Sequence, residues 1–166
     1  PRAEVIRDLD SLPWPSRKHL PIRNYYDQPG AIPEPTLQIW ASRGCPFQCV
    51  FCAWPQIMYG NNLYRTRNPV DVVDEIEAMK NEYGFRSVYF DDDTFNIGKK
   101  RILALCEEMR KRNLGLPWAA MARADTSDRE TLQAMKDAGL VAIKYGVESA
   151  SQELIDRAKK GLDLDR

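Results

Sequence analysis

Strand and helix patterns alternate along most of this chain, and this alternation limits the possible fold more than any other feature. Residues 36–41 (TLQIWA) and 87–91 (SVYFD) are short, apolar and rich in β-branched and aromatic side chains, as buried strands are. Two further strands are predicted at residues 118–123 and 141–148. Four strand–helix units in a row predict an α/β fold with a parallel sheet, either part of a (β/α) barrel or an open doubly wound sheet.

Helices are predicted after each strand, beginning near residues 69, 98, 127 and 149. The second helix ends near Asn113 and carries Cys106 in its apolar stripe, so Cys106 is predicted to pack in the core. Ser127 and Glu130 stand in capping-box register at the start of the third helix. No G-x-G-x-x-G run follows the first strand, which weakens a dinucleotide-binding reading of the doubly wound alternative.

The last strand alternates between two kinds of side chain. One face carries Val141, Ile143, Tyr145 and Val147 and is predicted to pack against helices. The other face carries Ala142, Lys144, Gly146 and Glu148, and a partly charged face of this kind fits a barrel lumen that holds a ligand. Since an unpaired buried ammonium is costly, Lys144 is expected to pair with a carboxylate such as Asp91 or Glu148.

Three cysteines occur within eight residues, in the spacing Cys45-x3-Cys49-x2-Cys52. A four-iron cluster normally takes four thiolates, so a three-cysteine site leaves one iron open to a small molecule. Zinc is the alternative, although the candidate fourth ligands, His19 and Cys106, are distant in the sequence. Redox or structural thiols are a further alternative, but four cysteines in 166 residues do not suggest a disulfide framework.

Composition sets the remaining limits. Twenty-four basic and twenty-four acidic residues cancel, which gives no support to a nucleic-acid or anionic-membrane partner. No apolar stretch is long enough to span a bilayer and the N-terminal sequence has no signal-peptide core, so a cytoplasmic location is expected. Residues 1–35 hold seven of the eleven prolines and are predicted to form an extended linker, with the folded domain at 36–166.

Polar residues follow each predicted strand, at the sheet edge where parallel βα proteins place their active sites. They are the cysteine run after the first strand, Asp91, Asp92 and Asp93 after the second, Arg123 and Asp125 after the third, and Glu148 and Ser149 after the fourth. Any one of these groups is ordinary at a strand end. Their expected convergence on the cysteine loop favours a functional site.

The run SRGCPFQCVFCAWPQ resembles the radical SAM superfamily, whose members carry this cysteine spacing with an aromatic residue, here Phe51, before the third cysteine. The stretches YRTRNPVDVVDEIE, YFDDDTFN and YGVESASQELID resemble the branch in which a cobalamin-binding domain precedes the barrel. This resemblance implies a partial barrel of six βα units, of which this chain supplies the first four. It also implies that residues 1–35 lead out of a cobalamin-binding domain absent from this chain.

Residue roles follow from the resemblance. Cys45, Cys49 and Cys52 would bind a 4Fe-4S cluster, and Phe51 would lie beside the adenine of S-adenosylmethionine. Many members carry Gly-Gly-Glu where this chain has Asp91, Asp92 and Asp93, so the group that meets the cofactor's ammonium is left open. Arg123 would pair with the cofactor's carboxylate. Glu148, beside Ser149, would bind the ribose hydroxyls. Which residues act on the substrate is unknown.

The implied reaction is reductive cleavage of S-adenosylmethionine to a 5′-deoxyadenosyl radical, with methyl transfer to carbon as the expected outcome where cobalamin is present. Ring closure or rearrangement is the runner-up, RNA methylthiolation a third possibility and a structural zinc module the non-enzyme alternative. The implied partners are an external flavodoxin- or ferredoxin-like one-electron reductant and a small-molecule substrate of unknown identity. Because two βα units are missing, these 166 residues alone are expected to be inactive.

Overall fold

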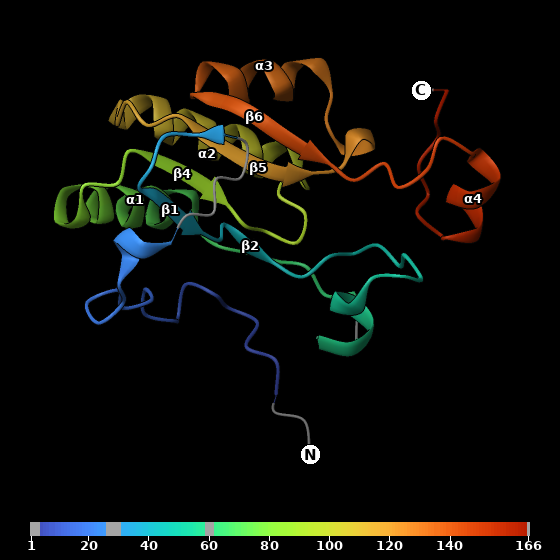
Figure 1. Cartoon of the computed structure of the whole chain (residues 1–166), viewed down its shortest axis with the longest axis horizontal. Coiled ribbons are helices and arrows are strands. Elements are labelled where there is room, and N and C mark those ends of the chain that lie inside the picture. Colours follow the sequence, from blue (N-terminus) through green and yellow to red (C-terminus); the bar gives the residue numbers. More distant parts are fainter. Residues whose placement is uncertain (1–3, 26–30, 59–61, 166) are drawn as a thin grey trace.

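The computed structural model describes residues 4–25, 31–58 and 62–165 of the chain. Its centre is a four-stranded parallel sheet in the order β1-β4-β5-β6 (Figure 1). The strands are β1 (Thr36–Ile39), β4 (Ser87–Phe90), β5 (Trp118–Ala122) and β6 (Leu140–Tyr145). The spatial order follows the chain order without the reversal that defines a doubly wound sheet. The sheet therefore has the strand order of a barrel wall, and the doubly wound alternative is wrong.

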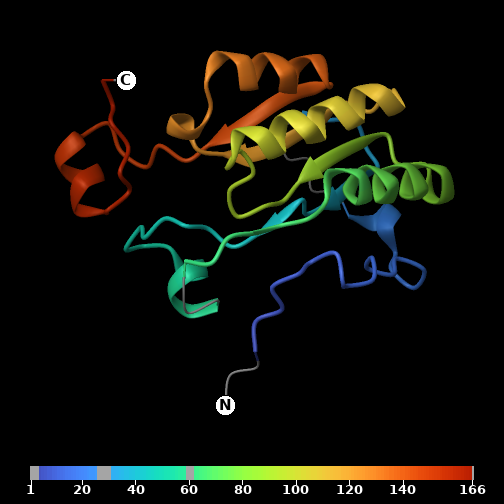
Figure 2. The same ribbon diagram turned by 180° about the vertical axis from the view of Figure 1, so that it is seen from behind.

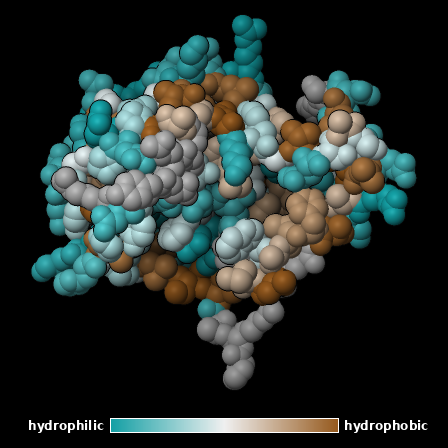
Figure 3. Space-filling model, viewed as in Figure 1, coloured by the Kyte–Doolittle hydropathy of each residue, from teal (hydrophilic) through white to brown (hydrophobic). Residues whose placement is uncertain are grey.

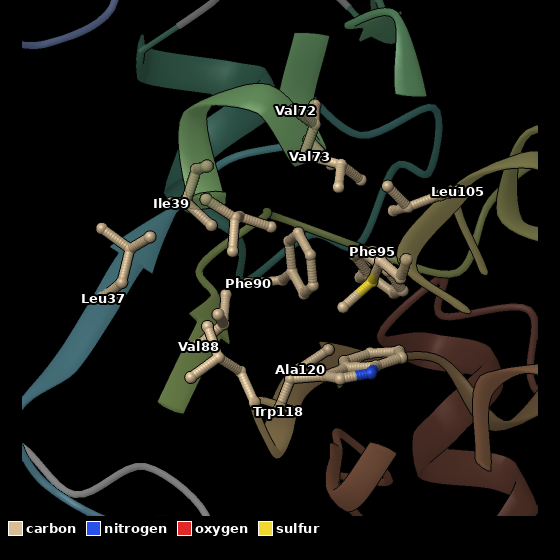
Figure 4. Packing of buried hydrophobic residues seen from close by; sticks show 14 of the residues in the cluster. Leu37, Ile39, Val72, Val73, Val88, Phe90, Phe95, Leu105, Trp118 and Ala120 are labelled. Atoms are coloured by element: carbon tan, nitrogen blue, oxygen red, sulfur yellow. The ribbon is translucent and has the colours of Figure 1, made fainter. Parts of the chain in front are cut away.

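Three helices cover one face of the sheet (Figures 1 and 2). They are α1 (Pro69–Tyr83), α2 (Lys99–Arg112) and α3 (Arg129–Asp137), whereas the short α4 (Gln152–Arg157) lies beyond the sheet. Figure 4 shows Val73 of α1 and Leu105 of α2 facing Phe90 of the sheet. The rings of Phe90 and Trp118 meet edge to face with centroids 5.3 Å apart. No helix among the described residues is long and apolar enough to cross a bilayer.

The helix ends follow from local sequence. The Asn68 side chain accepts a hydrogen bond from the Val70 amide at 2.9 Å and begins α1, and Gly84 ends α1 in the left-handed conformation. At α3 the cap is Asp128, which accepts from the Thr131 amide at 2.8 Å, and the predicted Ser127 cap is wrong. The reason is that the Ser127 hydroxyl accepts a hydrogen bond from Asn96 instead.

Strand β6 departs from simple alternation. The register between β5 and β6 shifts at Trp118, where Leu140 is followed in the pairing by Ala142. Val141 is the extra residue and is 60% exposed, so the prediction that it packs against helices is wrong. Ile143 packs against the helix-side core as predicted, and Ala142 lies on the opposite face.

The cysteines lie in a loop between two short strands, β2 (Ser42–Arg43) and β3 (Arg65–Thr66), which pair antiparallel. A one-turn π-helix, Trp54–Met58, follows Cys52, the last cysteine of this loop. Gly44 opens the loop with a φ of +89°, and a Cβ there would lie 1.9 Å from the carbonyl oxygen of Leu63. Only glycine fits this close approach of the two loop ends.

The proline-rich N-terminal segment contacts the folded domain at several points. The Asp10 carboxylate accepts a hydrogen bond from the Asn68 amide at 2.9 Å, and Arg17 forms a 2.9 Å ion pair with the buried Glu75. Ile32 is 2% exposed and packs against Tyr89 on the sheet face opposite the helices. Residues 1–3 and 26–30 of the predicted linker lie outside the described residues, and its role as a connector stays a prediction.

Candidate active site

An open cavity of about 350 Å³ lies at the carboxyl-terminal ends of the strands. Segments far apart in the sequence meet there because parallel strands end at one edge of the sheet. The predicted site residues that line it are Cys45, Cys49, Phe51, Cys52, Asp91, Asp92, Asp93, Arg123 and Glu148. Ser149 does not line the cavity, and its hydroxyl accepts a hydrogen bond from the Ser151 amide at 3.1 Å, just before α4.

The three loop cysteines share the wall of this cavity. The Cys45 Sγ lies 3.3 Å from the Thr94 hydroxyl, and the Cys52 amide donates to the Cys49 carbonyl at 3.1 Å. Burial raises the pKa of the Cys52 thiol, and the nearby Cys45 and Cys49 sulfurs raise it further. The three thiols of this loop thus share one cavity.

The surroundings of the sulfurs bear on which metal centre they fit. Among the described residues, no three His, Cys, Asp or Glu side chains gather closely enough to hold a single metal ion. A cluster takes each thiolate on a different iron, so its ligands need not meet at one atom. Three thiols on one loop, facing one cavity, therefore fit an iron–sulfur cluster.

Cys106 lies apart from this site. It is 1% exposed in α2, and burial raises the pKa of its thiol to about 12. The prediction that Cys106 packs in the core is confirmed.

Two of the three aspartates after β4 form hydrogen bonds with the residues that lead into the cysteine loop. Asp92 is 1% exposed and accepts hydrogen bonds from the Ala41 amide, at 3.1 Å, and from the Ser42 hydroxyl. Burial raises the pKa of the Asp92 carboxyl to about 6. Asp93 accepts from the Gly44 amide at 2.8 Å. These two side chains therefore fix the backbone that leads into Cys45.

Arg123 is anchored on several sides and only 5% exposed. Its guanidinium forms a two-pronged ion pair with Asp125, at 2.9 and 2.6 Å, and stacks 3.6 Å above the Phe47 ring centroid. The Asn96 side chain accepts from the Arg123 amide at 2.9 Å and donates to its carbonyl at 2.7 Å. The Nη1 group makes no hydrogen bond to any residue that the structure describes, so it remains able to meet an anionic ligand.

Glu148 adopts a positive φ of +73°, which is uncommon for a residue other than glycine. Its Oε1 lies 3.3 Å from Nζ of Lys160, which the sequence analysis missed as a site residue. A Cβ on Gly146 would lie 2.5 Å from this same Oε1, so glycine leaves the room that the carboxylate occupies. Lys160 stands twelve residues after Glu148, in the turn that follows α4, and no motif connects the two.

Lys144 does not form the predicted ion pair. It pairs in register with Met121, which lines the cavity, so it lies on the predicted face. Its side chain is exposed, however, and it makes no salt bridge within the described part of the chain. The carboxylate of Glu148 forms its ion pair with Lys160 instead. The expectation failed because solvent, which screens an exposed ammonium, reaches this end of β6.

Further lining residues were also missed, among them Trp40 and Arg43. Trp40 follows β1, and the Arg43 guanidinium lies 3.7 Å from the centroid of its ring. Both residues also line a second cavity, of about 200 Å³, which the N-terminal segment covers. The space-filling view shows apolar surface beside the cysteine loop (Figure 3), where Phe51 and Trp54 are about half exposed.

The fold and the site together define a class, namely proteins of parallel βα units in which a three-cysteine loop follows the first strand of the sheet and lines a cavity at the carboxyl ends of the strands. The chain belongs to the radical SAM superfamily, whose family model matches residues 41–166. That range includes every predicted site residue and begins just after β1. The superfamily implies a 4Fe-4S cluster and S-adenosylmethionine as cofactors.

Curated relatives share this region of sequence. The chain is 32% identical to an uncharacterized methyltransferase of Pyrococcus horikoshii, across 98% of this chain and 34% of the relative. It is 37% identical to the anaerobic magnesium-protoporphyrin IX monomethyl ester cyclase of Cereibacter sphaeroides, across 93% of this chain and 25% of the relative. The chain thus spans about a third or less of the length of these relatives.

Solved structures agree with the fold. The radical S-adenosylmethionine methyltransferase TsrM of Kitasatospora setae, in a structure with cobalamin and a [4Fe-4S] cluster bound, superposes with a TM-score of 0.65 at 22% identity. The match covers 72% of this chain and 24% of TsrM. The cobalamin-dependent S-adenosylmethionine radical enzyme OxsB gives 0.62 at 26% identity, across 78% of this chain and 20% of OxsB. The parallel sheet of βα units is therefore that of a radical SAM partial barrel.

Proposed function

We propose that this chain is the cluster-binding and S-adenosylmethionine-binding part of a cobalamin-dependent radical SAM enzyme that methylates a carbon atom. The observation that carries the proposal is the convergence of Cys45, Cys49 and Cys52 with Phe51 and Glu148 on one cavity. The residues that line this cavity would hold a 4Fe-4S cluster and S-adenosylmethionine, and the bound cluster would supply the electron for reductive cleavage of the sulfonium cofactor. Methyl transfer is supported by the similarity to methyltransferases.

The residues around the cavity would divide the work of holding the cofactor. The three thiolates would bind three irons and leave the fourth for the cofactor's amino and carboxylate groups. The Phe51 ring would face the adenine, and the Glu148 carboxylate would accept hydrogen bonds from the ribose hydroxyls. Arg123 would offer its Nη1 group to the cofactor's carboxylate.

The aspartates would play two parts. Asp92 and Asp93 already accept hydrogen bonds from the loop backbone, so they would position the cysteines. Asp91 also lines the cavity and would be the nearest counterpart of the Gly-Gly-Glu contact to the cofactor's ammonium. The remaining elements would lie outside this chain: a cobalamin-binding domain upstream, a one-electron donor of the flavodoxin or ferredoxin kind, and a small-molecule substrate.

A binding experiment tests the cofactor assignment. Anaerobically reconstituted protein is reduced with dithionite, and its electron paramagnetic resonance spectrum is recorded with and without S-adenosylmethionine. We expect the signal of a reduced 4Fe-4S cluster that changes when the cofactor is added, because the cofactor binds the open iron. A colourless protein that contains zinc would contradict the proposal. A cluster whose signal does not change when the cofactor is added would contradict it as well.

Ring closure is the second candidate, because the cyclase of Cereibacter sphaeroides is 37% identical over 93% of this chain. The two reactions differ in what becomes of the cofactor. Radical ring closure would leave only methionine and 5′-deoxyadenosine. Methyl transfer would give these products too, and would in addition convert a second S-adenosylmethionine, the methyl donor, into S-adenosylhomocysteine. Product analysis on a chain as long as these relatives separates the two: formation of S-adenosylhomocysteine supports methylation, and its absence during turnover supports ring closure.

A further inference from the structure

We infer that Lys160 is a positioning residue that holds Glu148 over the cofactor cavity, an inference that rests on the proposed binding of S-adenosylmethionine. Lys160 lies among the residues that line the cavity, and only 8% of its side chain is exposed. A lysine is seldom buried without a partner, because its ammonium loses hydration. The partner here is Glu148, with Nζ 3.3 Å from Oε1.

The backbone around Lys160 places its side chain at the cavity. The turn that ends α4 gives Lys159 a φ of +52° and Gly161 a φ of +67°. The Lys160 amide donates to the Ile155 carbonyl at 3.1 Å, and its carbonyl accepts from the Arg123 Nη2 at 2.8 Å. Adjacent lysines therefore point to different surroundings: Lys159 is exposed and Lys160 is buried.

The same turn is tied to the cysteine loop. The Val50 amide, between the second and third cysteines, donates to the Ala158 carbonyl at 3.0 Å. The Lys160 ammonium also lies 5.8 Å from the centroid of the Phe51 ring, within the range of a cation–π contact. Lys160 thus faces both groups assigned to the adenosyl part of the cofactor, the aromatic ring and the carboxylate.

Glu148 needs such a partner because its backbone conformation does not fix the direction of its side chain. Its side chain is 43% exposed and starts from a positive φ, so without Lys160 it would be free to turn into solvent. Gly146 leaves the space in which the two charged groups meet: a Cβ there would lie 2.5 Å from the Glu148 Oε1 and 3.3 Å from the Lys160 Nζ. With Oε1 held by Lys160, Oε2 is left to accept hydrogen bonds from a diol.

A double-mutant cycle on the reconstituted protein tests this role. The dissociation constant of S-adenosylmethionine is measured by equilibrium dialysis for the wild type, Lys160→Met, Glu148→Gln and the double variant. We expect Lys160→Met to weaken binding at least fivefold in the wild-type background and less than twofold in the Glu148→Gln background. Lys160→Arg, which keeps the charge, should retain most of the affinity.

Lys159→Met is the matched control, since it removes the same charge from the neighbouring exposed residue and should change binding less than twofold. Equal binding by wild type and Lys160→Met would overturn the inference. An equal loss in both Glu148 backgrounds would also overturn it, because Lys160 would then act on the cofactor without Glu148.

The ion pair has a second readout that needs no cofactor. Unfolding midpoints of the same four proteins should show that the two substitutions are not additive, as expected for side chains in contact. Additive shifts of the unfolding midpoint would overturn the Lys160–Glu148 interaction whether or not the cofactor binds. A wild-type protein that binds no S-adenosylmethionine but shows the coupling would refute the proposed function and leave the ion pair intact.

Discussion

Cysteine side chains occur in two different environments in this protein. Four cysteines have the same side chain, yet three line an open cavity and Cys106 is enclosed by the apolar core. The sequence predicted this division, because spacing groups the first three and helical periodicity assigns the fourth. It did not predict Lys160 or the hydrogen bonds of Asp92, since contacts between residues far apart in the chain leave no local pattern.

The first prediction concerns metal binding. Alanine at position 45, 49 or 52 should abolish or strongly reduce 4Fe-4S loading, because each thiolate is expected to hold one iron. Cys106→Ala should keep the full iron content and lower the free energy of unfolding by about 1–2 kcal/mol through lost packing. Iron and sulfide are counted after anaerobic reconstitution. Loss of the cluster in Cys106→Ala with retention in Cys49→Ala would refute the assignment.

The second prediction follows from the pKa of about 6 for Asp92. The folded protein holds this proton up to about pH 6, whereas the unfolded chain releases it near pH 3.8, the ordinary pKa of an aspartate. Between these values the folded state binds more protons, so the stabilisation by protonated Asp92 is complete below pH 4 and is lost as the pH rises through 6. The change amounts to about 3 kcal/mol.

Urea unfolding of the metal-free protein between pH 4 and 7 measures this effect, with Asp92→Asn as the reference. The free energy of unfolding of the wild type should decrease relative to that of Asp92→Asn as the pH rises. A constant difference between the two proteins over this range would show that Asp92 does not titrate there.

Elements were easier to predict than their edges. Some edges were predicted: α1 begins after Asn68, and α2 lies between Gly98 and Asn113. The register shift at Val141 and the choice of Asp128 over Ser127 were not predictable. The register shift depends on how β6 pairs with β5. The position of the N-cap depends on the hydrogen bond that Asn96 donates to the Ser127 hydroxyl.

The third prediction tests how the cysteine loop is closed. Gly44→Ala should reduce cluster loading and lower the free energy of unfolding by about 3 kcal/mol, because its Cβ would collide with the Leu63 carbonyl. Gly84→Ala is the matched control: its φ is also positive, but nothing lies within 4 Å of the added atom. It should cost only about 1 kcal/mol and leave the iron content unchanged. Equal effects of the two substitutions would show that the close approach is not critical.

At the scale of the whole molecule, the sequence predicted the order of elements and the edge of the sheet where polar residues gather. Repeated strand–helix units and polar strand ends are sufficient for that, since topology brings such ends together. The sequence could not show that the proline-rich segment contributes Ile32 to the face opposite the helices. A proline-rich coil gives no periodic signal from which a buried contact could be inferred.

The fourth prediction concerns the activity of the 166-residue chain assayed by itself. β6 is an edge of the sheet and its Val141 and Tyr145 are exposed, whereas the opposite edge strand, β1, accepts a hydrogen bond from Arg17 at the Gln38 carbonyl. Uncovered strand edges favour association with other chains, and an open cavity admits water that quenches radicals. We expect S-adenosylmethionine binding, self-association in sedimentation experiments and no sustained substrate turnover. Repeated turnover by this chain would show that further strands are dispensable.

Glu75 has no exposed surface and two arginine partners, Arg17 at 2.9 Å and Arg67 at 2.7 Å. The same arginines donate to the Gln38 and Trp40 carbonyls, at 3.2 and 3.0 Å. A shortened gene that starts at the first predicted strand would delete Arg17 and leave Arg67 as the remaining ion-pair partner of the buried Glu75. For protein engineering, a shortened chain should therefore begin before Arg17, well upstream of Thr36, where the first strand begins.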